Sequence, residues 1–189
     1  MVAPGAGPPT ETRTEPVNST ELGSRSQHLI TTCTQVGLSI AAAESLTGGR
    51  FVATLVDVPG ASAVVRGGVI TYATDLKSRL VGVDAEHLDK TGPVDEVVAA
   101  QMAAGAAREC VADIGVACTG VAGPEPQDDK PVGLVYTAIA FAGKAQVSEH
   151  HFTGDRDAIR SLTVAAMMSD LDDFVARLAF GPGAKDEES

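Results

Sequence analysis

Aromatic residues are scarce in this chain. Trp is absent, and Phe, Tyr and Trp together make up 4% of the 189 residues. Hydrophobic residues still reach 44%, so a core of ordinary size has to be built from Ala, Val, Leu and Ile. No apolar run approaches the roughly 20 residues of a membrane span, and no basic segment followed by an apolar stretch marks a secretory signal. The sequence therefore predicts a cytoplasmic protein with no membrane partner.

Basic residues are also few. Lys and Arg number 14 against 25 Asp and Glu, which gives a formal net charge of -11 at pH 7. General nucleic-acid binding needs a basic surface that neutralises phosphates, so we expect no nucleic-acid partner. A small anionic ligand is still compatible with this charge, because a few arginines in a pocket override the global field locally.

Cysteine and histidine are few and lack the spacing of metal ligands. The cysteines are Cys33, Cys110 and Cys118. All three lie among apolar residues, and we expect small buried side chains. Cys118 could instead be a thiol nucleophile, but no histidine lies near it in the sequence. His150 and His151 are neighbours in an expected strand, so their side chains point to opposite faces. We expect no metal site and no cofactor.

The two ends of the chain differ in composition from its middle. Residues 1–18 hold four of the ten prolines, with Thr, Glu and Gly, and predict a disordered leader. Residues 181–189 are short and acidic and predict a disordered tail. The sequence between them, 19–180, has no internal linker and no repeat, which indicates one folded domain.

Apolar runs typical of strands alternate with helical patterns in this middle part. We expect strands over 38–43, 64–72, 114–118, 132–141 and 146–152. We expect helices over 20–35, 47–56, 74–81, 95–110 and 155–178. The alternation indicates an α/β layered fold around a sheet of about five strands. The short connection at 142–144 predicts a hairpin, which makes the sheet mixed. In such folds ligands bind beyond the carboxyl ends of the strands.

Ser45 lies just past the carboxyl end of the first of these strands, before a glycine-bearing helix start. A hydroxyl there is exposed beside free backbone N–H groups, which can stabilise an oxyanion or a phosphate. The residues that would supply these donors are Thr47, Gly48 and Gly49. The logic is that of the nucleophile elbow, although Gly-x-Ser-x-Gly itself is absent. Two interpretations stay open: Ser45 is a nucleophile, or Ser45 or Thr47 merely caps the helix.

A serine nucleophile needs a base, and the histidines are not placed to serve. Lys77 lies three residues after Thr74, in the first turn of an expected helix, where a cation opposes the helix dipole. Burial would lower its pKa further, towards that of a usable base. The alternative is a solvated surface lysine. Tyr72 ends the preceding strand; its hydroxyl could relay a proton or hold the lysine, or its ring could simply cover the core.

Two further segments could line the same pocket. Thr119 and Gly120 follow another strand and open a glycine-bearing turn, although the glycine could serve only the backbone conformation. Arg156 and Arg160 lie one turn apart at the start of the last helix and can present guanidinium groups to a phosphate. Pairing with nearby surface acids is the competing interpretation for both arginines.

Four motifs occur in a fixed order along the chain. They read AESLTGG at 43–49, GVITYATDLK at 68–77, TGVAGP at 119–124 and KPVGLVY at 130–136. In this order they resemble the CinA carboxy-terminal domain, the nicotinamide-nucleotide amidohydrolase (PncC) family. The resemblance covers roughly residues 20–178. Only a short leader precedes that region, which indicates a stand-alone form.

The resemblance implies an enzyme that converts nicotinamide mononucleotide to nicotinic acid mononucleotide and ammonia in pyridine-nucleotide recycling. It implies a catalytic Ser–Lys pair assisted by a tyrosine, which matches Ser45, Lys77 and Tyr72, and it implies no metal. It further implies a three-layer α/β/α sandwich that forms a homo-oligomer, a dimer or larger. Among the two arginines, Arg156 is our candidate for holding the substrate phosphate.

The chain departs from the family pattern at 125–129. Where the family usually has glycines, this sequence reads EPQDD, which is stiffer and more acidic. Acids at a pocket border disfavour a phosphate. Two alternatives to nicotinamide mononucleotide deamidation therefore stay open: an amidase for a different, less anionic amide, and a catalytically silent member that binds a nucleotide or a partner protein.

Overall fold

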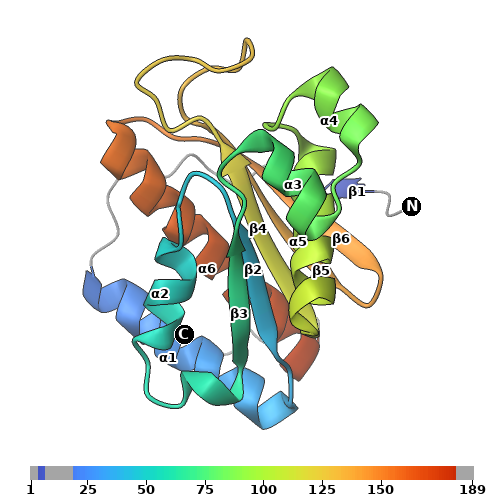
Figure 1. The fold of residues 1–189 in the computed structure, drawn as a ribbon. Helices are drawn as coiled ribbons and strands as arrows, with labels where there is room; N and C mark the ends of the chain where they lie inside the picture. The colour runs from blue at the N-terminus through green and yellow to red at the C-terminus, as the bar shows by residue number, and fades with distance from the viewer. Residues whose placement is uncertain (1–3, 7–18, 182–189) are drawn as a thin grey trace.

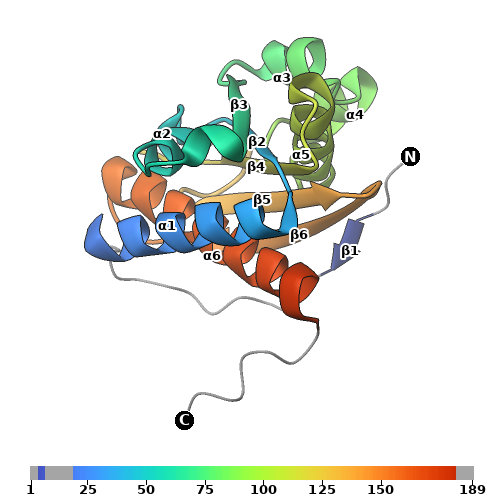
Figure 2. The same ribbon diagram turned by 90° about the horizontal axis from the view of Figure 1, so that it is seen from below.

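A six-stranded sheet lies between two layers of helices in the computed structural model, which describes residues 4–6 and 19–181 (Figure 1, Figure 2). The strand order is β1-β6-β5-β4-β2-β3. The strands are β1 Pro4–Ala6, β2 Ile40–Glu44, β3 Val65–Ile70, β4 Ile114–Gly120, β5 Leu134–Phe141 and β6 Lys144–His151. The helices are α1 Ser19–Val36, α2 Arg50–Val56, α3 Thr74–Val81, α4 Ala85–Thr91, α5 Glu96–Cys110, α6 Arg156–Phe180 and the 3-10 turn η1 Ala61–Ala63.

The sheet is mixed, as the sequence predicts. Strands β3, β2 and β4 lie side by side and run parallel, whereas β5 is antiparallel to both of its neighbours, β4 and β6. The hairpin between β5 and β6 turns at residues 142–143, where the expected short connection lies. Because β2, β3 and β4 are parallel, their carboxyl ends meet at one edge of the sheet, which is where the candidate site residues follow.

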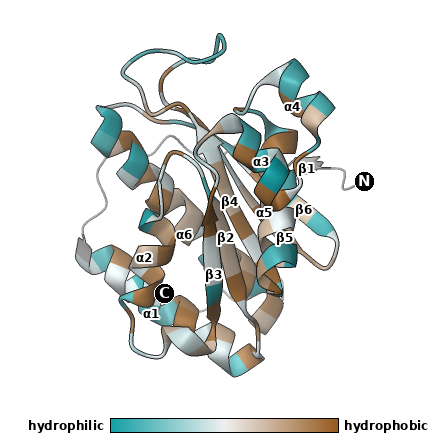
Figure 3. Cartoon of the chain, in the orientation of Figure 1, coloured by the Kyte–Doolittle hydropathy of each residue, from teal (hydrophilic) through white to brown (hydrophobic). Residues whose placement is uncertain are grey.

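The helices cover both faces of the sheet, which confirms the three-layer arrangement. Helices α1, α2 and α6 lie on one face, and α3, α4 and α5 lie on the other (Figure 2). Strand β2 is buried along its whole length and serves both cores, since Ile40 and Ala42 join the core under α1 and α6 while Ala43 joins the core under α5. Figure 3 shows hydrophobic residues concentrated in these central strands. No helix within the described residues is long and apolar enough to cross a membrane.

Several elements differ from the sequence expectation. Helix α4 and the turn η1 were not expected, because neither carries an apolar stripe of useful length. Strand β1 is a sixth strand that pairs with β6 inside the stretch expected as a leader. The remainder of the expected leader lies outside the described residues, and so does the expected tail 181–189 apart from Gly181.

The cysteines and histidines are placed largely as expected. Cys33 and Cys118 are buried, and Cys110 is partly buried. His150 is buried and His151 exposed, as neighbours in a strand should be. Across residues 4–6 and 19–181, no three His, Cys, Asp or Glu side chains gather in a way that could hold a metal ion.

Candidate active site

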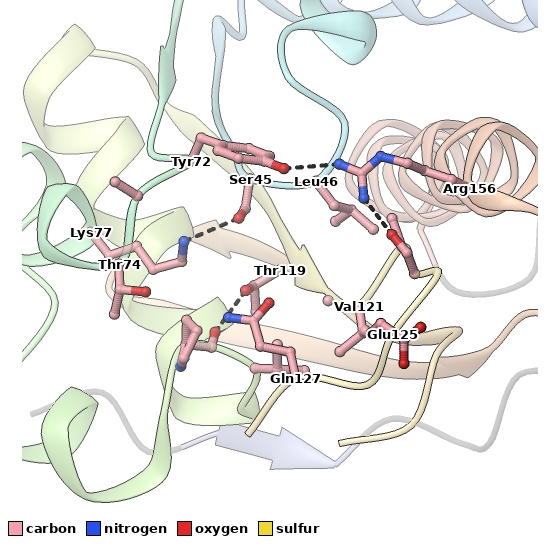
Figure 4. A pocket seen from close by; sticks show the side chains of 16 residues that line it. Ser45, Leu46, Tyr72, Thr74, Lys77, Thr119, Val121, Glu125, Gln127 and Arg156 are labelled. Carbon is pink, nitrogen blue, oxygen red and sulfur yellow. Dashed lines mark hydrogen bonds between the residues drawn. The ribbon is translucent and has the colours of Figure 1, made fainter. Parts of the chain in front are cut away.

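Ser45 and Lys77 meet at the carboxyl edge of the sheet. Ser45 directly follows β2, and its backbone N–H donates to the Cys118 carbonyl of β4 at 3.3 Å. The Lys77 Nζ, carried by α3, lies 3.0 Å from the Ser45 Oγ. The two residues are 32 positions apart in the chain, so the fold, and not local sequence, creates this pair. Figure 4 shows the two side chains pointing toward each other.

Lys77 is a buried amine and not a surface lysine. It is 1% exposed, and its Nζ donates to the Thr71 carbonyl at 2.7 Å as well as to Ser45. Burial lowers the pKa of Lys77 from its ordinary 10.5 to about 8, while the nearby Cys118 acts in the opposite direction. An amine with such a pKa is partly neutral near neutral pH, so its lone pair can take a proton from a neighbouring hydroxyl.

The loop that carries Ser45 is held by hydrogen bonds from two charged side chains, one nearby in the sequence and one far from it. The buried Glu44 carboxylate accepts hydrogen bonds from the N–H groups of Gly49, Phe51 and Val52 at 2.9, 3.1 and 3.0 Å. From the other side, the Arg160 guanidinium donates to the carbonyls of Leu46 and Thr47, both at 2.8 Å. Glu44 therefore caps α2 and fixes the turn after the serine. Sequence reasoning missed Glu44, although a charge at the end of an otherwise apolar strand is a usable signal.

The helix-cap interpretation of Ser45 and Thr47 is wrong. Helix α2 begins at Arg50 with Gly49 as its N-cap residue. Glycine has no side chain that could cap the helix, and the Glu44 carboxylate accepts the hydrogen bond from the Gly49 N–H instead. The Thr47 Oγ1 instead lies 3.1 Å from the Cys118 Sγ and is fully buried. Ser45 is therefore left without a capping role, and its hydroxyl faces Lys77.

The expected N–H donors at 47–49 do not serve the cavity beside Ser45. The Gly48 N–H donates to the Ser45 carbonyl at 3.1 Å, and the Gly49 N–H donates to Glu44. None of residues 47–49 lines the pocket beside Ser45. Spacing alone places these amides near the serine but does not show which of them already has an acceptor.

A cavity of about 380 Å³ opens beside Ser45 and Lys77. Of the other residues expected at the site, Tyr72, Thr119, Gly120 and Arg156 line it. The Thr119 hydroxyl donates to the Pro93 carbonyl at 2.6 Å and so fixes one wall. Gly120 is needed for close packing, because a Cβ there would lie 2.7 Å from the Leu134 carbonyl oxygen. Its φ is not positive, so the backbone conformation does not require a glycine there.

Tyr72 and Arg156 form one side of this cavity. An NH2 group of Arg156 donates to the Tyr72 hydroxyl at 2.8 Å, and its other terminal nitrogen donates to the Gly123 carbonyl at 2.6 Å (Figure 4). Lys77 is held by the Thr71 carbonyl and not by the Tyr72 hydroxyl. Arg156 has no carboxylate within 4.0 Å in the part of the chain that the structure describes. Its positive charge is therefore available to an anionic ligand in the cavity, whereas Arg160 does not line the cavity.

The segment at 124–130 also contributes to the cavity. Glu125 and Gln127 line it, and neither was expected as a site residue. The sequence signals that this segment departs from the family pattern, but it does not show that these two side chains reach the same cavity as Ser45.

Comparisons with known proteins show which family the chain resembles. The model of the CinA C-terminal domain matches residues 23–175. A CinA-like protein of Frankia casuarinae is 42% identical over 147 residues, which are 78% of this chain and 33% of that protein. Another CinA-like protein, from Geobacter sulfurreducens, is 44% identical over 133 residues, 70% of this chain and 32% of that protein. The chain thus spans about a third of the length of the curated relatives it matches.

Solved structures show the same fold. A CinA superfamily protein from Klebsiella pneumoniae superposes with a TM-score of 0.79 at 31% identity, covering 85% of this chain and 99% of that one. A competence/damage inducible protein from Agrobacterium tumefaciens gives a TM-score of 0.77 at 35% identity, over 84% and 97% of the two chains. With the family model matched over most of the described residues, the chain belongs to the CinA C-terminal domain family.

Proposed function

We propose that this chain is an amidohydrolase that deamidates nicotinamide mononucleotide through a Ser45–Lys77 pair. The observation that carries the proposal is the 3.0 Å contact between the Lys77 Nζ and the Ser45 Oγ. A serine beside a lysine with a lowered pKa is one of the recurring variants of the nucleophile–base arrangement. The family resemblance supplies the substrate.

In the proposed reaction, neutral Lys77 takes the proton of the Ser45 hydroxyl, and the Ser45 oxygen attacks the carboxamide carbon. The resulting ammonium of Lys77 then returns the proton to the nitrogen that leaves as ammonia. Water, deprotonated by Lys77, hydrolyses the acyl-enzyme ester to the carboxylic acid and frees Ser45. Transfer is direct, because the Tyr72 hydroxyl bonds to Arg156 and not to the pair.

The oxyanion of this reaction needs a donor, and we assign it to the Leu46 N–H. Leu46 follows the nucleophile and lines the cavity. Among residues 46–49 only Leu46 lines the cavity, and within the described residues no acceptor is found for its N–H. The N–H after the nucleophile has this role in nucleophile elbows as well.

We assign the substrate phosphate to Arg156 and an aromatic wall to Tyr72. Arg156 reaches the cavity from α6 and keeps its charge unpaired by any carboxylate of the described residues. A homo-oligomer in the cytoplasm is part of the same proposal. Because Glu125 also lines the cavity and opposes a phosphate electrostatically, an amidase for a less anionic amide is the second candidate.

Incubation of the purified chain with nicotinamide mononucleotide tests the proposal. We expect ammonia and nicotinic acid mononucleotide to be released in equal amounts. Release of ammonia only from other members of a panel of amides would favour the second candidate. Thermal stabilisation by the mononucleotide without any product would contradict the enzymatic assignment and indicate a binding protein.

A further inference from the structure

The 124–130 segment forms a cavity wall that the proposed reaction does not use. It brings two polar side chains, Glu125 and Gln127, into the lining of the cavity that holds Ser45 and Arg156. Figure 4 shows the Gln127 side chain extending toward Thr119 and the inside of the cavity, with Glu125 on the same wall. Both side chains are therefore placed to contact a ligand in the cavity.

The backbone of this wall is closed by hydrogen bonds. The Lys130 N–H donates to the Gln127 carbonyl at 2.8 Å, and the Gln127 N–H donates back to the Lys130 carbonyl at 3.2 Å. Asp128 and Asp129, at the tip between them, have φ of 49° and 60°, the left-handed region that a tight turn requires. Arg156 holds the other end of the segment through the Gly123 carbonyl. The loop is therefore a hydrogen-bonded turn and not an extended segment without backbone hydrogen bonds.

The chemistry of the wall is that of a hydroxyl-binding surface. A carboxylate accepts hydrogen bonds only, whereas a carboxamide both donates and accepts. Within the described residues the Glu125 carboxylate has no hydrogen-bond or ion-pair partner, so its oxygens are free to accept from a ligand. Carboxylates bind neighbouring ribose hydroxyls in this way in dinucleotide-binding folds.

We propose that Glu125 and Gln127 bind the hydroxyl groups of a sugar that links the reacting amide to the anionic group of the substrate. This inference rests on the proposed function, since the amide end lies at Ser45 and the anionic end at Arg156. The same cavity then carries three subsites, and the third one selects glycosylated amides over bare ones. The two side chains are specificity-determining residues, and they take no part in the proton transfers.

Paired substrates test this subsite. Nicotinamide mononucleotide and its 2′,3′-dideoxy analogue carry the same amide and phosphate but differ in the ribose hydroxyls. We expect Glu125→Ala and Gln127→Ala each to raise KM for nicotinamide mononucleotide about tenfold, and to change KM for the dideoxy analogue less than about twofold. Asp129→Asn, which removes a charge from the same loop outside the cavity lining, should leave both KM values unchanged. Equal effects of the Glu125 and Gln127 variants on the two substrates, or no effect on either, would overturn the proposal.

A binding measurement separates this inference from the proposed reaction. Ribose 5-phosphate carries the hydroxyls and the phosphate but no amide, so its binding does not depend on turnover. By titration calorimetry we expect it to bind the wild type and to bind the Glu125→Ala and Gln127→Ala variants about tenfold more weakly. If the wild type does not bind it, or if the variants bind it equally well, the sugar subsite is wrong even when amides are hydrolysed. If it binds as expected while no amide is hydrolysed, the subsite stands and the amidohydrolase proposal falls.

Discussion

At the scale of single residues, Lys77 decides what the site can do. Burying a lysine is costly, because its charged form loses hydration, and the same loss lowers its pKa. Here the amine is 1% exposed and is held by two neutral oxygens, the Thr71 carbonyl and the Ser45 hydroxyl. Neither partner carries a charge that would stabilise the ammonium. Burial is therefore the cause of the lowered pKa, and the helix dipole suggested by the sequence is not needed.

This pKa predicts the pH dependence of turnover. In the proposed reaction Lys77 acts in its neutral form, and its pKa is lowered to about 8. Below that value the neutral fraction grows tenfold for each pH unit, so kcat/KM for nicotinamide mononucleotide should rise about tenfold per unit up to pH 8 and level off above it. Steady-state rates between pH 6 and pH 10 check this. The Lys77→Met variant should show no such rise, and a wild-type rate that is constant over this range would contradict Lys77 as the base.

At the scale of elements, the positions of Ser45 and Lys77 depend on how helix α3 and the turn after Ser45 pack against their neighbours. Helix α3 carries Lys77, and α5 packs against its C-terminal end at Gly105. A Cβ on Gly105 would lie 1.9 Å from the Val81 carbonyl oxygen, so only glycine permits this approach. On the other side of the sheet, Glu44 and Arg160 hold the turn after Ser45 through backbone groups. The Ser45–Lys77 pair is thus positioned by contacts outside the pair itself.

Two glycine-to-alanine changes in helices should have opposite effects on stability. Gly105→Ala forces α5 and α3 apart and should lower the free energy of unfolding by about 3 kcal/mol. Gly23→Ala, in the exposed part of α1 with nothing within 4 Å of the new Cβ, should raise it by about 0.5–1 kcal/mol through helix propensity. Urea unfolding of both variants measures the difference. A Gly105→Ala variant as stable as Gly23→Ala would show that this close approach does not matter.

At the scale of the whole molecule, the sequence predicts the α/β sandwich and the meeting of Ser45 with Lys77. The α/β fold follows from the alternation of strand and helix patterns, and its three layers from the family resemblance. The pairing of Ser45 with Lys77 follows from the gathering of residues after parallel strands at one sheet edge, together with that resemblance. What sequence reasoning could not reach depends on hydrogen bonds between distant groups. Which amides of 47–49 already have an acceptor depends on Glu44 and on the Ser45 carbonyl. The place of Gln127 depends on how the 124–130 loop folds back. Helix α4 was missed because seven residues carry too little periodicity.

The central claim is that Ser45 is the nucleophile, and one comparison tests it most directly. Ammonia release from nicotinamide mononucleotide at pH 8 is measured for the wild type and for Ser45→Ala at equal concentrations, with circular dichroism to verify that both are folded. The account predicts that the wild type releases ammonia and that Ser45→Ala loses at least about a thousandfold in rate. A Ser45→Ala variant that retains activity within tenfold of the wild type would contradict it.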